Sequence, residues 1–199
     1  MAGAFPISTA KFESLGIKSI QNTIISKSVS GKKLARQIDG QRWGFTARII
    51  TAKRSDVYGQ LMAFIIKQRL GKENFTIVPP EVEDARGTAS GTPTGTGSAG
   101  DTSITLGGTG TGTLKAGDFI KFANHSKVYM VVADQSDIST GTLTIEPPLT
   151  TAVSSSDIQY DDVPFTVYLT NDIQEFGVVG AGQDGTLLYQ FEFDVEEAL

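Results

Sequence analysis

Residues 87–113 constrain the fold more than any other part of this chain, because they consist almost entirely of small residues. The segment holds 9 glycines and 9 threonines in 27 residues. Such a composition can bury little apolar surface, and glycine loses the most backbone freedom when it becomes ordered. The segment therefore predicts a linker or an extended, poorly packed arm, with room for a short strand at residues 102–106.

The region before this segment predicts antiparallel strands joined by tight turns. A first strand spans residues 18–29 and ends at Ser30-Gly31, and a second spans residues 32–38 and ends at Asp39-Gly40. The Asp-Gly pair suits a type I′ hairpin turn, so a third strand should pair with the second. In that third strand, one face is expected to be buried, because its apolar residues recur with period two: Trp43, Phe45, Ala47 and Ile49.

A helix is predicted next, from Asp56 to Leu70. Ser55 is a suitable N-cap, Asp56 favours the positive end of the helix dipole, and Gly71 lies just beyond the last turn. A short strand at residues 74–78 should follow and end at Pro79-Pro80, since proline cannot continue a central ladder.

The second half of the chain predicts more short strands, in two groups. Residues 118–122, 127–133 and 141–145 are β-rich runs that suggest a small barrel or sandwich. Two further runs, 165–169 and 173–179, precede a final strand in which Leu187, Tyr189, Phe191, Phe193 and Val195 alternate with more polar residues.

These last strands need a sheet, and the amino-terminal strands can supply it. We therefore expect a mainly β protein: a β-sandwich with one flanking helix, formed by residues 1–80 and 164–199. An inserted acidic β module, residues 81–163, would split this domain and would contain the linker at 87–113.

Charge is distributed unevenly along the chain. Residues 1–80 carry 13 basic and 4 acidic side chains, whereas residues 81–199 carry 4 and 18, within a net charge of -5. Opposite charges can steer copies of one protein into head-to-tail association. Nucleic-acid binding is a weaker interpretation, because the basic residues are dispersed and the acidic half would repel phosphate.

The residue inventory argues against most catalytic and metal-binding chemistry. The chain has no cysteine and one histidine, which excludes thiolate sites and disfavours histidine metal clusters and a Ser-His-Asp triad. We expect no enzymatic activity, no cofactor and no metal. The apolar run at residues 61–66 is far too short for a membrane helix, and the amino terminus lacks the features of a secretion signal, so we expect no membrane partner.

Four local motifs have plain structural interpretations. Residues 95–100 match G-x-G-x-x-G but lack the strand before and the helix after that a dinucleotide site requires. The acidic pairs at 134/137, 161/162 and 196/197 are expected to be solvated turn residues, and His125 an exposed loop residue. Trp43 lies on the apolar face of its strand, where core packing is favoured over carbohydrate stacking.

Several segments together resemble structural proteins of tailed bacteriophages, in particular the distal tail protein family. The resemblance rests on the Asp39–Trp43 strand, the helix containing Ala63–Arg69, the Asn74–Pro80 run, and the β segments Leu114–Phe122, Lys127–Val132 and Thr144–Leu149. The last three are similar to small β modules of phage virion proteins.

This resemblance implies a β-sandwich subunit that assembles as a ring, usually a hexamer, around the channel through which genome DNA passes without sequence-specific binding. It implies contacts with the tail tube, hub or fibres, a location in the virion tail and assembly in the host cytoplasm. The acidic module would then hold peripheral parts, because no long carboxy-terminal carbohydrate-binding domain is evident.

Two alternatives remain open: a tail-tube or tube-capping subunit, and a carbohydrate-binding or adhesive β module. The last is favoured by the Thr/Gly-rich stretch, and by Trp43 and the tyrosines if they are exposed. For the ring, the candidate subunit-interface residues are basic side chains that would meet acidic surface on a neighbour: Lys32, Lys33, Arg36, Arg42 and Arg48.

Overall fold

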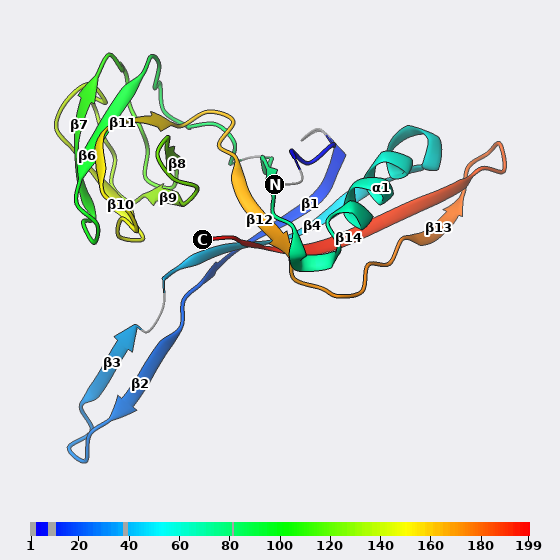
Figure 1. Ribbon diagram of the computed structural model, residues 1–199, viewed down its shortest axis with the longest axis horizontal. Coiled ribbons are helices and arrows are strands. Elements are labelled where there is room, and N and C mark those ends of the chain that lie inside the picture. The colour runs from blue at the N-terminus through cyan, green and yellow to red at the C-terminus, as the bar shows by residue number, and fades with distance from the viewer. Residues whose placement is uncertain (1–2, 8–10, 38–39, 81) are drawn as a thin grey trace.

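The computed structural model describes residues 3–7, 11–37, 40–80 and 82–199 of the chain. Within these ranges, the protein consists of a six-stranded sheet with one α-helix, a closed six-stranded barrel, and a two-stranded arm that projects from the sheet (Figure 1). The expected mainly β class is confirmed.

Strands from both ends of the chain build the six-stranded sheet. Its order is β1-β4-β14-β12-β5, with β13 paired to β14, and all of these pairings are antiparallel. These strands form one sheet rather than two facing sheets. Their bounds are β1 Phe12–Ile20, β4 Arg42–Lys53, β5 Phe75–Ile77, β12 Phe165–Leu169, β13 Gly177–Ala181 and β14 Leu187–Glu197.

One face of the sheet forms the larger core, as the alternation in β4 predicted. Its apolar residues pack with Tyr58, Leu61 and Ile65 of the helical segment. The Tyr58 hydroxyl donates a hydrogen bond to the carbonyl of Ile50 at 3.0 Å and so ties this segment to β4. The buried β4 residues are Trp43, Phe45, Ala47 and Ile49.

The predicted helix is present, but its ends differ from the prediction. A π-helical turn, Arg54–Tyr58, precedes α1, Gly59–Lys67, and a 3₁₀ turn, Leu70–Lys72, follows. Ser55 lies inside the first turn and donates to Asp56 instead of capping the helix. At the other end, Arg69 rather than Gly71 adopts the left-handed conformation, with φ of 52°.

The expected three-stranded meander is wrong. Strands β2, Thr23–Lys27, and β3, Lys33–Gln37, pair only with each other, while β4 pairs with β1 and β14. The physical reason is that the apolar face of β4 requires a core, which the arm, exposed on both faces, cannot provide. The predicted Asp39-Gly40 turn lies partly outside the described residues.

The region between β5 and β12 contains a closed antiparallel barrel of order β10-β7-β6-β11-β8-β9. Three of its strands coincide with predicted β-rich runs, whereas β11 was not predicted because its serine-rich sequence lacks clear apolar alternation. The bounds are β6 Pro93–Gly97, β7 Ser103–Gly108, β8 Phe119–Phe122, β9 Val128–Val131, β10 Thr142–Glu146 and β11 Val153–Gln159.

The expectation of a poorly packed linker at residues 87–113 is also wrong, because β6 and β7 belong to the barrel wall. Only the short strand expected at 102–106 is confirmed, because it overlaps β7, Ser103–Gly108. Close packing inside the barrel requires glycine at position 95, because a Cβ there would lie 2.6 Å from the Phe122 ring and 3.0 Å from Ile104. The composition reflects a narrow barrel interior rather than an absence of structure.

Gly95→Ala should therefore destabilise the barrel. The added methyl group has to displace the side chains of Phe122 and Ile104, and overpacking of this kind costs about 1–3 kcal/mol. Gly107→Ala is the matched control, because the nearest atom to its Cβ lies at an ordinary 3.4 Å. Urea unfolding followed by circular dichroism measures both, and equal stability of the two variants would contradict this packing argument.

Candidate assembly interface

The barrel contacts the sheet through a buried ion pair between Lys127 and Glu197. Lys127 directly precedes β9, and Glu197 is the last residue of β14. The Lys127 Nζ lies 2.5 Å from the Glu197 Oε2, and the two side chains are 2% and 0% exposed. Lys127 also donates to the side-chain oxygen of Gln41 at 2.9 Å. Burial lowers the pKa of Lys127, and the Glu197 carboxylate opposes that shift.

The same carboxylate accepts hydrogen bonds from the backbone of both parts. The Trp43 amide of β4 donates at 3.1 Å, and the Val128 amide of the barrel donates at 2.8 Å. In return, the Trp43 indole donates to the Val128 carbonyl at 2.9 Å. The Phe119 ring packs edge-on against Trp43, with centroids 5.0 Å apart. These contacts, which we call the junction cluster, fix the barrel in one position on the sheet.

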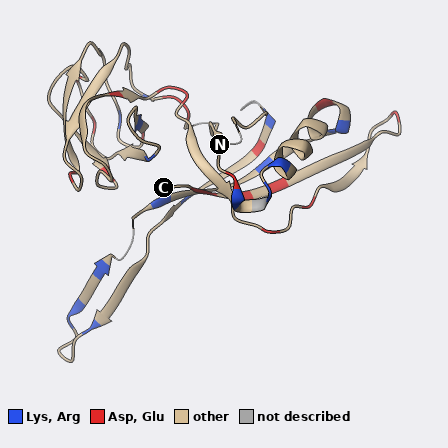
Figure 2. Cartoon of the chain, viewed as in Figure 1, with Lys and Arg blue, Asp and Glu red and all other residues tan. Residues whose placement is uncertain are grey.

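The arm, residues 21–37, is the second feature relevant to assembly. It carries Lys27, Lys32, Lys33 and Arg36 and no acidic residue, and none of these four makes an ion pair within the described chain. Lys27 lies directly opposite Lys33, which is an unfavourable cross-strand pair. Figure 2 shows this basic arm extending away from the sheet.

Exposed apolar side chains accompany these charges on the arm. Ile24, Ile25 and Leu34 are each more than half exposed, and Val29 at the tip is fully exposed. An isolated two-stranded ribbon is at best marginally stable in water, and exposed apolar clusters mark interaction sites. The arm therefore has the properties of a segment that becomes covered by a partner.

The five predicted interface residues do not gather on one surface. Lys32, Lys33 and Arg36 belong to the arm, whereas Arg42 and Arg48 lie on the polar face of β4. Arg48 contacts Glu13 at 3.6 Å and donates to Gln190. Arg42 lines a pocket with Tyr168 and Leu199. Their role at a subunit interface stays a prediction.

Residues 81–161, which include the barrel, match the family model described as the distal tail protein pb9, B domain. The chain thus resembles a tailed-phage distal tail protein. The match supports a structural role in a phage tail. No match was found among curated proteins.

The structure also shows where the glycine-rich motif and the acidic residues lie. Residues 95–100 lie in β6 and the turn after it, and β7 rather than a helix follows, so the dinucleotide motif has no structural context. Asp134 and Asp137 are exposed, as expected, and bond to Lys115 and Ser139 respectively. The described residues hold no cluster of three or more potential metal ligands, and none of their helices could span a membrane.

Two expectations about individual residues are wrong. His125 is half-buried, and its Nε2 lies 2.8 Å from the Tyr129 hydroxyl, so it is not an exposed loop residue. Burial lowers its pKa. Glu197 is fully buried in the junction cluster rather than solvated in a turn. The sequence indicates this position, because Glu197 follows Phe193 and Val195 at every second residue of β14 and so lies on the buried face.

Part of the uneven charge is neutralised within the subunit. Lys18 pairs with Asp194 at 3.2 Å, and Lys53 pairs with Asp184 at 2.5 Å. The hydroxyl of Thr46, followed by Lys18, lowers the pKa of Asp194. In both pairs a basic side chain of β1 or β4 meets an acidic residue of β14 or of the turn before it, whereas the four basic residues of the arm form no such pair within the described residues.

Removing one member of the junction ion pair should strongly destabilise the protein. Glu197→Gln leaves Lys127 buried without a counter-charge, which typically costs about 3–5 kcal/mol. The exposed pair provides the control, and Lys53→Met should cause only a small change. Fluorescence of Trp43, the sole tryptophan, should shift to the red at lower urea in Glu197→Gln. A loss no larger than that of the control would contradict the assigned role of the pair.

Acid should weaken the contact between β4 and the β13–β14 turn. A hydrogen bond from Lys53, followed by one from the Thr186 amide, lowers the pKa of Asp184 from 3.8 to about 2. Because the folded state binds this proton less tightly, the stabilisation is present above pH 3.8 and is lost as the pH falls towards 2. Thermal unfolding across this range should therefore depend less steeply on pH in Asp184→Asn and in Lys53→Met than in the parent. If the melting temperature depends equally on pH in the parent and in both variants, the Lys53–Asp184 contact does not cause the pH dependence.

Proposed function

We propose that this protein is a structural subunit of a phage tail tip. It assembles with itself as a ring, with a hexamer expected, around the DNA channel and joins the tail tube to the hub or fibres. The observation that carries the proposal is the match of residues 81–161 to the B domain of a distal tail protein. On this proposal, the protein acts in the virion tail, is assembled in the host cytoplasm, and lets DNA pass without reading its sequence.

The proposed division of labour follows the chain. Residues 1–80 and 164–199 would form the ring, and residues 81–163 would be an inserted module that contacts peripheral tail parts. The junction cluster would hold that module in a fixed direction relative to the ring. Since Glu197 loses its barrel partners when the module is removed, deletion should allow the ring domain to fold only with reduced stability.

The arm supports self-association. Its basic residues form no ion pair among the described residues and its apolar residues are exposed, and a neighbour with acidic and apolar surface would supply partners for both. Exposed ion pairs stabilise by at most about 1 kcal/mol each, so they would mainly steer association, while apolar burial would hold it. Repetition around a ring multiplies both effects.

The tail-tube alternative shares these features and differs in that rings would stack. The carbohydrate-binding alternative loses the support of its aromatic residues, because Trp43 is buried and none of the five tyrosines is exposed. Native mass spectrometry and negative-stain microscopy separate the three. Single closed rings support the proposal, stacked rings favour the tube subunit, and a monomer that binds glycans overturns the proposal.

Charge reversal on the arm should slow ring formation. In the triple variant Lys32→Glu, Lys33→Glu and Arg36→Glu, the arm would repel acidic surface on its neighbour, and the monomer should stay folded because these residues lie outside the core. The rate of assembly is measured by light scattering at low and high salt.

The matched control carries the same change in charge at the end of the helix: Lys67→Glu, Arg69→Glu and Lys72→Glu. It should assemble at nearly the parent rate. Equal assembly rates for both triple variants at every salt concentration would show that the arm charges do not influence assembly.

A further inference from the structure

The arm needs a specific acceptor, and among the described residues the surface around β13 matches it best. We propose that the arm of one copy docks onto the groove beside β13 of a second copy, an inference that rests on the proposed ring. This groove of about 320 Å³ lies between β13, the loop before it, and the polar face of β4 and β14. Its lining residues are Arg48, Ile173, Glu175, Gly177, Val179, Gln190 and Glu192.

Apolar side chains at the groove are exposed in the single subunit. Ile173 is 85% exposed and Val179 is 54% exposed. Val179 lies at the irregularity in the β13–β14 register, where Val178 pairs with Tyr189 and Gly180 with Leu188. β13 is also an edge strand, because among the described residues it pairs with β14 alone. The groove thus offers apolar surface beside an open sheet edge.

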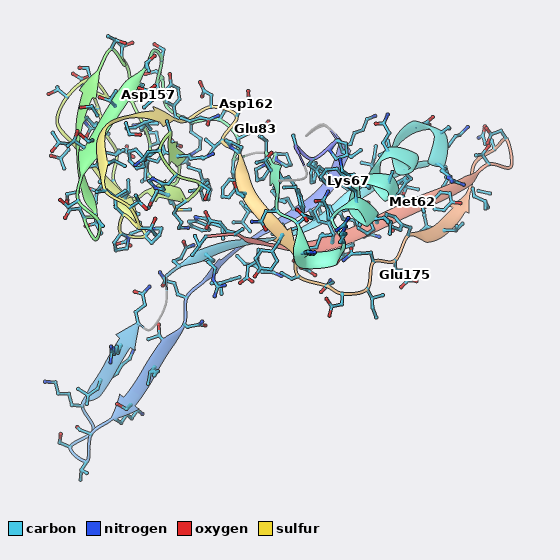
Figure 3. All side chains as sticks on the ribbon, in the orientation of Figure 1. Met62, Lys67, Glu83, Asp157, Asp162 and Glu175 are labelled. Carbon is cyan, nitrogen blue, oxygen red and sulfur yellow. The ribbon has the colours of Figure 1, made fainter. Side chains whose placement is uncertain are left out.

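The charges at the groove complement those of the arm. Glu175 and Glu192 are exposed, and Glu192 lies opposite Arg48 in the β4–β14 register without an ion pair among the described residues. Figure 3 shows Glu175 on the loop that leads into β13. The one basic residue of the lining, Arg48, already contacts Glu13. The groove therefore combines apolar residues with a net acidic charge, and the arm combines apolar residues with unpaired basic ones.

The placement of the two surfaces requires a second copy. The arm and β13 lie at opposite ends of the molecule, so an arm cannot reach the groove of its own chain (Figure 1). Contact between two different surfaces of identical subunits is head-to-tail and forms a ring when the rotation closes. One such contact per subunit satisfies every arm and every groove.

Other surfaces fit the arm less well. The edge of β5 is occupied by the amino-terminal segment, since the Phe5 amide donates to the Thr76 carbonyl at 2.7 Å. The edge strand β1 offers no unpaired acidic residue to a basic arm, because its one glutamate, Glu13, contacts Arg48 and its one lysine, Lys18, pairs with Asp194. The barrel is acidic, but Val132 is its only large apolar residue among those exposed in the described chain.

Pairwise cross-linking tests the contact directly, because the chain contains no cysteine. An Ile25→Cys protein is mixed with a Val179→Cys protein and treated with a short bismaleimide under assembly conditions. A heterodimer joined at residues 25 and 179 is expected. Val132→Cys, an exposed position on the barrel, is the matched control and should give no more product than a mixture lacking one cysteine.

A charge exchange provides a second, independent readout. Lys33→Glu and Glu192→Lys should each slow association by roughly three- to tenfold, and the double variant should recover most of the parent rate. Rings that form normally while residue 25 links no better to 179 than to 132 would overturn this acceptor and leave the ring intact. A protein that stays monomeric under all conditions would overturn both the acceptor and the proposed function.

Discussion

The buried pair of Lys127 and Glu197 is the contact on which the architecture of the subunit depends. It joins the end of the last sheet strand to the start of a barrel strand, and its carboxylate also holds the backbone of β4 at Trp43 and of the barrel at Val128. Two charges removed from water are tolerated only when their hydrogen bonds are satisfied, and here both partners have further neighbours. The barrel is consequently a fixed part of the subunit rather than a tethered appendage.

The arm has the opposite character. The sheet and barrel each enclose a core, whereas the arm has two strands, like charges facing each other and no covered face. It emerges directly before Gln41 and Trp43, so its base is anchored by the junction cluster while its tip is free. A rigid body with one uncovered ribbon is suited to assembly, because association then orders a single element.

Sequence patterns predicted those elements whose signal is local. The alternation in β4 and β14, the helix, and three barrel strands follow from periodicity, and the resemblance to distal tail proteins rested on such runs. The segment 87–113 was misjudged because its glycines are required by the Phe122 and Ile104 side chains, which lie far along the chain or in another strand. Composition alone cannot separate a glycine that is flexible from one that is crowded.

The junction cluster shows the same limit. Parity places Glu197 on the buried face of β14, but nothing near Lys127 in the sequence indicates that the two side chains meet. Their pairing depends on how the barrel lies on the sheet, which is a property of the whole fold. Likewise, the sequence shows the partition of charge into two halves, but it does not show the Lys18–Asp194 and Lys53–Asp184 pairs that partly neutralise it.

The central claim is that the sheet and the barrel form one rigid body and that assembly orders the arm. Amide hydrogen exchange before and after assembly tests it most directly. The Trp43 and Val128 amides, both bonded to Glu197, should exchange as slowly as those in the centre of β4, while the arm amides should exchange rapidly in the monomer and become protected in the assembly. Rapid exchange at Val128 in the monomer, or an arm that exchanges equally in both states, would contradict the account.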